Sequence, residues 1–218
     1  AAHLAAYGGD RLAREFTARI EAVARAEQSV APGSSRLGDA AAQSLFKLMA
    51  VKDEYEVARL LTGRAFETQL AGQFERWTRV DYHLAPPFIA RTGANGRPEK
   101  RRFGPWLKPV LKLLAAARFL RGGPFDPFSW QGERREERRI RDAFAADLDR
   151  IAATLGTETF ETAVMLARAP MQVRGYGPVK AAAIATYEAE RARLLARLDP
   201  RAAAPTAAQG KISADSEV

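Results

Sequence analysis

Asp53 is the acidic residue of this sequence with the most unusual surroundings. Met49 and Val57 lie four residues before and after it, so on a helix its carboxylate would project from an apolar stripe. A carboxylate in such a place needs a partner if the stripe is buried, and it could serve as the acid of an active site. Structural ion pairs arise from the same pattern more often, and we interpret Asp53 as a member of one.

Four further polar residues complete a candidate buried polar cluster around Asp53. Lys52 and Glu54 add two charges at the same level of the helix. His83 could titrate near neutral pH, but beside a double-proline turn we interpret it as a hydrogen-bonded structural histidine. Arg102 lies in a basic and aromatic stretch of the kind that stacks single-stranded nucleic acid, and it could equally pair with a carboxylate of the same domain.

A glycine-rich loop before the last predicted helix is a second candidate site. Its residues are Arg174, Gly175, Gly177 and Lys180. Free backbone N–H groups and the positive end of the helix dipole would meet there, which suits an anion. We prefer the alternative that this helix start meets an acidic side chain of the same protein, with Asp53 or Glu54 as candidates, or simply solvent.

The motifs of common catalytic and cofactor sites are absent from the sequence. It contains no G-x-x-x-x-G-K-[ST] loop, no G-x-G-x-x-G fingerprint, no H-E-x-x-H zinc motif and no G-x-S-x-G nucleophile. With no cysteine and two histidines, it offers no thiolate to zinc or iron–sulfur clusters and few imidazole ligands. We therefore expect no catalytic residue, no bound cofactor and no metal site in this chain.

The chain is basic, with 34 Lys and Arg against 26 Asp and Glu and a net charge of +8. Such an excess could neutralise the phosphates of a nucleic acid. Most arginines, however, alternate with acidic residues at helical spacing, and in residues 133–141 Glu137 precedes Arg141 by four positions. We interpret this stretch as a solvated face whose charges pair with one another, and we do not expect nucleic acid as a partner.

Apolar periodicity predicts that helices carry most of these side chains. The expected helices cover residues 12–30, 39–61, 65–74, 104–120, 133–155, 157–170 and 178–198. Residues 77–84 alternate between apolar and polar side chains, and residues 100–103 could return beside them as a hairpin. The 104–120 helix is apolar around most of its circumference, which predicts a central position in a core. The predicted fold class is therefore mainly α: a multi-helix domain with one small β-hairpin.

Composition divides the chain into three expected parts. Residues 1–36 would be an amphipathic helix and linker from a preceding domain, residues 37–199 a helical C-terminal domain, and residues 200–218 a disordered tail. No run approaches the length of a membrane span, no signal peptide is recognisable, and the first residue is not Met. We expect a cytoplasmic piece of a longer polypeptide, without a membrane partner.

Five stretches of the sequence, in a fixed order, carry a family resemblance. They are residues 46–60 with the segment KDEYEVARL, 83–87 (HLAPP), 96–106 (GRPEKRRFGPW), 126–128 (DPF) and 174–180 (RGYGPVK). Together they resemble the C-terminal region of the bacterial indolepyruvate ferredoxin oxidoreductase family, including its fused long-chain forms. The resemblance covers residues 44–198. One departure is Gly177-Pro178, where we would expect a histidine before Val-Lys.

This resemblance implies that the parent protein oxidatively decarboxylates an aryl 2-oxoacid such as indolepyruvate. Thiamine diphosphate and 4Fe–4S clusters, bound elsewhere in the parent, would do the chemistry, with ferredoxin accepting electrons and coenzyme A the acyl group. This chain would be a terminal helical domain without catalytic residues, which packs against preceding domains of a homo-oligomer or closes over the active site. The alternative is a free-standing basic helical module that binds nucleic acid or regulates another protein.

Overall fold

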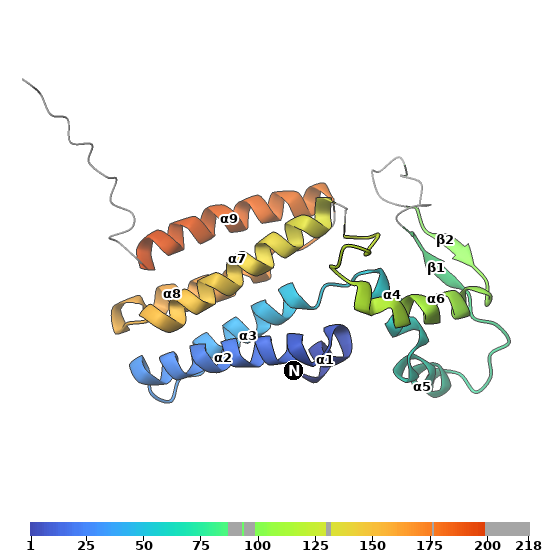
Figure 1. Cartoon of the computed structure of the whole chain (residues 1–218), viewed down its shortest axis with the longest axis horizontal. Coiled ribbons are helices and arrows are strands. Elements are labelled where there is room, and N and C mark those ends of the chain that lie inside the picture. Colours follow the sequence, from blue (N-terminus) through green and yellow to red (C-terminus); the bar gives the residue numbers. More distant parts are fainter. Residues whose placement is uncertain (87–92, 94–98, 130–131, 176, 199–218) are drawn as a thin grey trace, which may run out of the picture.

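The computed structural model describes residues 1–86, 93, 99–129, 132–175 and 177–198, which form a long helical bundle and a smaller lobe (Figure 1). The bundle contains α1 (Ala2–Gly8), α2 (Asp10–Val30), α3 (Arg36–Met49), α7 (Gly132–Thr154), α8 (Phe160–Arg168) and α9 (Pro178–Leu198). The lobe contains α4 (Glu54–Thr62), α5 (Arg64–Gln73), β1 (Tyr82–Leu84), β2 (Arg101–Phe103), α6 (Leu107–Ala116) and the 3-10 helix η1 (Ala117–Leu120). Two further 3-10 helices, η2 (Thr157–Thr159) and η3 (Ala169–Gln172), flank α8.

The predicted fold class is confirmed: the chain is mainly helical and carries one two-stranded antiparallel hairpin. Tyr82 pairs with Phe103 and His83 with Arg102 across the hairpin. The predicted tail, residues 200–218, lies outside the described residues, as does most of the turn between the two strands. Among the described residues, no helix has the length and apolar character required to span a membrane.

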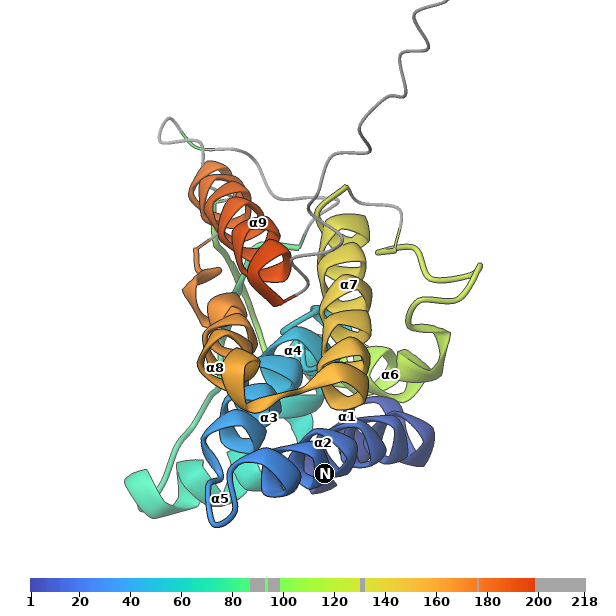
Figure 2. The ribbon, with the colours of Figure 1, turned by 90° about the vertical axis from the view of Figure 1, so that its left-hand side faces the viewer.

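The bundle core is one hydrophobic cluster that draws on all six bundle helices. Ile140, Phe144 and Ile151 form a buried stripe on α7, as the helical period of the sequence predicts. Leu4 of α1 and Val23 of α2 belong to the same cluster. Residues 1–36, treated above as a segment from a preceding domain, therefore pack into the bundle, and Figure 2, which looks along its length, shows α2 beside α3 and α7.

The lobe has its own smaller core, in which α6 lies against α4 and the hairpin. Leu107, Leu111 and Ala115 of α6 are buried with Ala58 of α4 and Tyr82 of β1. The prediction that this apolar helix is central is wrong, because only one of its faces is covered. The helix is also shorter than predicted and continues as η1.

The prediction of a single helix from residue 39 to residue 61 is also wrong, because the chain breaks at residues 50–53. Asp53 adopts an extended conformation and its side chain accepts a 2.8 Å hydrogen bond from the backbone N–H of Glu56. It is thus the N-cap of α4 rather than a residue within a helix. Asp39, the first residue of the predicted helix, lies in the first turn of α3, which begins at Arg36.

The first turn of α3 is capped by a carboxylate from α2. Glu27, which is 1% exposed, accepts hydrogen bonds from the Leu37 N–H at 3.0 Å, the Gly38 N–H at 2.8 Å and the Ser34 hydroxyl at 2.6 Å. Burial raises the pKa of Glu27, but these hydrogen bonds outweigh burial and the pKa lies below its ordinary value. The ionised carboxylate therefore fixes the turn between α2 and α3 and complements the dipole of α3.

We predict that Glu27→Gln lowers the free energy of unfolding by about 1–3 kcal/mol at pH 7. Because the folded-state pKa is depressed, this stabilisation is present above the ordinary glutamate pKa of 4.5 and is lost as the pH falls through the folded-state pKa. Urea denaturation of both proteins from pH 7 to pH 3 should show the difference shrinking in acid. Glu21→Gln, at an exposed position of the same helix, is the control and should change stability by no more than about 0.5 kcal/mol. A pH-independent difference would contradict the capping role of the charge.

Candidate functional site

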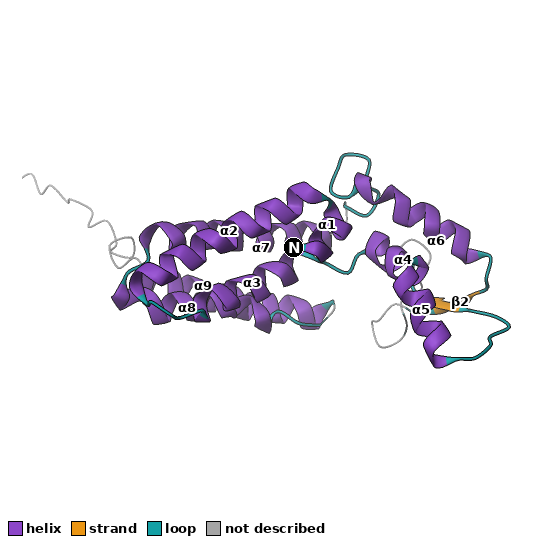
Figure 3. Cartoon of the chain, turned by 90° about the horizontal axis from the view of Figure 1, so that it is seen from below, coloured by secondary structure: helices purple, strands orange, loops and turns teal. Residues whose placement is uncertain are grey.

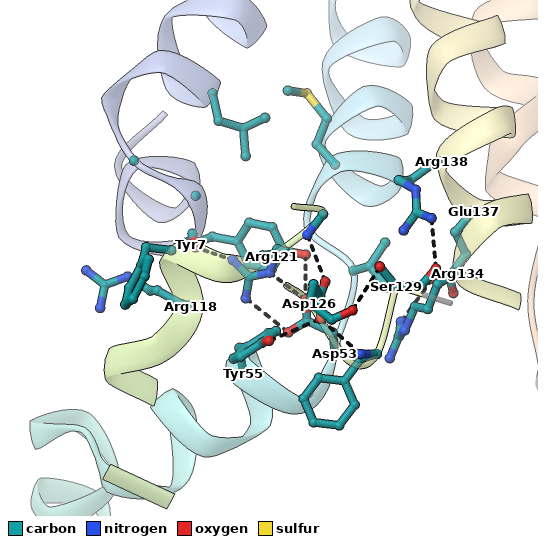
Figure 4. Close-up of a pocket in the computed structure, with 18 of the residues that line it drawn as sticks. Tyr7, Asp53, Tyr55, Arg118, Arg121, Asp126, Ser129, Arg134, Glu137 and Arg138 are labelled. Atoms are coloured by element: carbon teal, nitrogen blue, oxygen red, sulfur yellow. Dashed lines mark hydrogen bonds and ion pairs between the residues drawn. The ribbon is translucent and has the colours of Figure 1, made fainter. Parts of the chain in front are cut away.

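A cleft of about 650 Å³ lies where the bundle meets the lobe (Figure 4). Residues from α1, α3, α4, α7, η1 and the loop between η1 and α7 line it. Ligand sites are frequent at such junctions between structural units, so the cleft is the first place to look for function. Its floor is a network of buried charged and hydroxyl groups.

The centre of this network is an ion pair between Asp53 and Arg121, the residue after η1. Arg121 donates from Nε to Asp53 Oδ2 at 2.5 Å and from Nη2 to Asp53 Oδ1 at 3.0 Å, a bidentate arrangement. The side chains of Arg121 and Asp53 are 17% and 9% exposed. The pair therefore sits in a partly desolvated place, where its geometry matters more than on the surface.

Tyr7 of α1 joins the bundle to this ion pair. Its hydroxyl donates to Asp53 Oδ2 at 3.3 Å, and its backbone carbonyl accepts a short hydrogen bond from Arg121 Nη1. The Arg121 guanidinium lies 3.7 Å from the centre of the Tyr7 ring, close enough for a cation–π contact. One arginine thus contacts α1 and the N-cap of α4 at the same time.

A second carboxylate, Asp126, organises the loop that leads from the lobe to α7. It accepts hydrogen bonds from the Gly122 N–H at 2.7 Å, the Phe128 N–H at 3.0 Å and the Tyr55 hydroxyl at 3.0 Å. Gly122 has a φ of 72°, a left-handed conformation that glycine adopts without strain. The Tyr55 ring packs edge-on against Phe128, with ring centres 5.3 Å apart.

Arg134 of α7 extends the network across the cleft. It pairs with Glu54 at 3.2 Å and with Glu137 at 2.9 Å. Glu137 also pairs closely with Lys180 of α9, whose amino group lies 3.0 Å from Glu133. Figure 4 shows Arg134 and Glu137 on the opposite side of Asp126 from Tyr7. Charged groups therefore link the lobe to α1 on one side and to α7 and α9 on the other.

The hydrogen bonds of the network determine whether its carboxylates can transfer protons or only position neighbouring groups. The pKa of Tyr7 is raised by burial and by the nearby Asp53, and that of Tyr55 by burial and its hydrogen bond to Asp126. Both tyrosines remain protonated donors, while Asp53 and Asp126 each accept several hydrogen bonds. A carboxylate whose lone pairs are occupied in this way positions its neighbours rather than transferring protons. In the described part of the chain, no three His, Asp or Glu side chains gather to hold a metal ion.

The structure brings only part of the candidate polar cluster together. Asp53 is buried in the network and Glu54 is half-buried against Arg134, whereas Lys52, His83 and Arg102 are exposed. His83 is thus not the buried residue that we expected, because it occupies the outward side of a hairpin with one covered face. Arg102 does pair with a carboxylate of its own domain, since its Nε donates to Asp81 at 2.9 Å.

The predicted anion loop meets acidic side chains of the same chain, although not those that we named. Lys180 is bound by Glu133 and Glu137 instead of Asp53 or Glu54. The loop arginine is exposed and donates to the Met171 carbonyl at 3.2 Å. Because Lys180 is paired with these carboxylates, it is not free to bind an anion together with Arg174, Gly175 and Gly177.

Pairing along α7 also differs from the sequence expectation. Glu137 was expected to pair with Arg141, four residues later, but it is engaged by Arg134 and Lys180, while Arg141 pairs with Asp142 at 2.8 Å. Part of this face is consequently buried in the cleft instead of solvated. The reason is that Glu54 of α4 and Lys180 of α9 reach α7 and supply partners from distant parts of the chain.

Sequence analysis missed Tyr7, Arg121, Asp126 and Arg134 as members of the site. One signal was present for Asp126, because an aspartate followed by proline and phenylalanine after two glycines is typical of a side chain that caps its own turn. No local signal marks Arg121, which lies 68 residues from Asp53. Its role depends on the way the lobe folds back onto α1.

A comparison with protein-family models identifies the family of this chain. The model, described as a family of unknown function (DUF6537), matches residues 1–193. The chain belongs to this family. No curated protein and no solved structure matches it. The matched residues include both the bundle and the lobe, so the cleft between them lies within the family region.

We predict that Asp53→Ala lowers the free energy of unfolding by about 3–5 kcal/mol, because it leaves Arg121 buried without its carboxylate and removes the cap of α4. Thermal or urea denaturation measures the change. Asp39→Ala, at an exposed position in the first turn of α3, is the matched control and should cost no more than about 0.5 kcal/mol. A loss below about 1 kcal/mol for Asp53→Ala would mean that the buried pair does not hold the fold together.

Proposed function

We propose that this chain is the non-catalytic C-terminal helical domain of a thiamine diphosphate-dependent 2-oxoacid:ferredoxin oxidoreductase acting on indolepyruvate or a related aryl 2-oxoacid. In that role it packs against the preceding domains of the same cytoplasmic polypeptide and closes one side of the catalytic assembly. Ferredoxin, coenzyme A and the homo-oligomeric arrangement belong to the parent enzyme.

The observation that carries the proposal is where the family-resembling stretches lie. The stretch at 46–60 supplies Asp53 and Tyr55, the stretch at 126–128 supplies Asp126, and the stretch at 174–180 supplies Lys180. Three of the five stretches, although far apart in sequence, therefore contribute to the network beneath the cleft, at the joint between the bundle and the lobe, whereas His83 and Arg102 of the other two lie in the hairpin. A shared pattern, three of whose members meet at this joint, supports common architecture rather than chance similarity.

The chemistry of the joint favours a packing role over a catalytic one. Its carboxylates are held by arginine, tyrosine and backbone donors, and its tyrosines stay protonated. The sequence has no cysteine, so this chain cannot supply thiolate ligands to an iron–sulfur cluster and does not fit that cofactor. In our proposal thiamine diphosphate and the clusters are therefore held by other domains.

The alternative of a basic nucleic-acid module receives less support from the charges. Arg19 pairs with Asp149 at 2.7 Å, Arg36 with Glu161 at 2.6 Å and Arg191 with Asp147 at 2.5 Å. Each of these arginines reaches a carboxylate on another helix and is engaged within the fold. A phosphate backbone would have to compete with these carboxylates.

We predict that the protein, tagged in its gene and purified from its own cells, carries thiamine diphosphate, iron and acid-labile sulfide in the same assembly. That assembly should reduce a viologen dye when supplied with indolepyruvate and coenzyme A. A version of the parent without residues 1–218 is the control for the cofactors, because its catalytic domains should still bind them. Purification of this protein without thiamine diphosphate or iron–sulfur clusters would contradict the proposed function.

A further inference from the structure

The cleft between bundle and lobe carries more positive charge than its polar network uses. Among the described residues, six arginines line the cleft against three carboxylates, which are Asp53, Asp126 and Glu137. The network binds two of the arginines, Arg121 and Arg134. The other four are Arg11, Arg118, Arg138 and Arg141.

Three of these four arginines come from two neighbouring helices. Arg138 and Arg141 are three residues apart on α7, a spacing that places them on one face of the helix. Arg11 lies in the first turn of α2, which packs beside α7. Figure 3 shows α2 running along α7, with α1 at the end of the bundle that faces the lobe. Figure 4 shows Arg118 and Arg138 on opposite sides of Arg121, so Arg118 belongs to the other end of the cleft.

The carboxylates of this chain leave these three arginines largely available. Arg138 is half-buried, and its Nη2 donates to the Ser129 carbonyl at 2.9 Å, but no carboxylate of the described residues pairs with it. Arg11 lies 3.7 Å from Glu15 on the exposed surface of its own helix, and Arg141 pairs with the exposed Asp142 next to it in sequence. Exposed pairs of this kind are worth about 1 kcal/mol or less. A guanidinium also has more N–H donors than one such contact uses.

Apolar side chains lie beside the three arginines. Leu12 and Met49 border the cleft, and together with Arg11 and Arg141 they also border a neighbouring hollow of about 360 Å³. Leu48 adds a third apolar side chain to the cleft. The cleft volume of about 650 Å³ is typical of pockets that hold small organic molecules. An inorganic ion would leave the apolar wall uncovered.

We propose that this cleft binds a small organic anion through Arg138, Arg141 and Arg11. The anionic group, a carboxylate or a phosphate, accepts charge-assisted hydrogen bonds from the guanidinium groups. The apolar body of the ligand packs against Leu12 and Met49. This inference uses only residues of the present chain and is independent of the proposed function, which assigns no ligand to the chain.

Titration calorimetry of the 218-residue chain tests the site with phenyl phosphate and phenylacetate as probes. We expect saturable binding with one probe molecule per chain, and the tighter of the two probes identifies the anionic group that the site prefers. Inorganic phosphate lacks the apolar body and benzyl alcohol lacks the charge. Each should bind at least about tenfold more weakly than the preferred probe.

Arg138→Gln should weaken binding of the preferred probe by about tenfold, because it removes the half-buried cation that has no carboxylate partner. Arg135→Gln is the matched control, since Arg135 is exposed on the same helix, does not line the cleft and carries the same charge. It should change the affinity by less than about twofold. Arg141→Gln is a second variant, expected to weaken binding several-fold. Its only ion pair is with an exposed neighbour, so the fold should be retained, and thermal denaturation checks this for each variant.

Three results would overturn the inference. The first is the absence of saturable binding of either aromatic anion at concentrations up to about 10 mM. The second is an equal loss of affinity in Arg135→Gln and Arg138→Gln, which would show a general attraction to the basic chain. The third is binding of inorganic phosphate as tight as that of phenyl phosphate, which would show that the apolar wall takes no part.

Discussion

The bidentate contact between Arg121 and Asp53 is the interaction on which the arrangement of bundle and lobe depends. Asp53 caps α4, and thereby fixes the direction in which the lobe leaves the bundle. Arg121 follows η1, at the point where the chain returns from the lobe. A single pair therefore holds the outgoing and the returning segments together, and Tyr7 attaches both to the first helix of the bundle.

A joint made of charges has different consequences from a joint made of apolar contacts. Buried ion pairs contribute little net stability compared with well-packed apolar residues, but losing one partner is costly. Such a pair can specify one orientation, because its hydrogen bonds form only when the groups are aligned. Asp126 extends this principle to the connecting loop, whose backbone N–H groups it orders. For a domain proposed to pack against a large catalytic assembly, a defined angle between bundle and lobe is the useful property.

Periodicity predicted most helices of this fold, and its failures have physical causes. Met49 and Val57 keep helical spacing across residues 50–53, so the break at Asp53 is invisible to a search for apolar stripes. Apolar residues at helical spacing stand on both sides of Asp53, so the sequence alone does not show whether this aspartate lies within a helix or at an N-cap. The sequence showed that α6 is apolar around most of its circumference, but periodicity does not reveal which of its faces the rest of the chain covers.

The candidate site was predictable only at residues whose neighbours in the sequence show that the side chain requires a partner. Asp53 stood out because a carboxylate among apolar neighbours must be compensated, whereas Arg121 is an ordinary arginine until the lobe brings it to Asp53. Lys180 was recognised as a cation at a helix start, but its partners lie more than forty residues earlier on α7. Long-range pairing of charges is decided by packing, which local patterns do not encode.

The most direct test of this arrangement is a double-mutant cycle of Asp53→Ala and Arg121→Met, measured as free energies of unfolding in urea. If the pair joins the bundle to the lobe, the double variant should be only slightly less stable than the weaker single variant, with a coupling energy of about 2–3 kcal/mol. Additive losses, with a coupling energy within about 0.5 kcal/mol of zero, would contradict the central place given to this interaction.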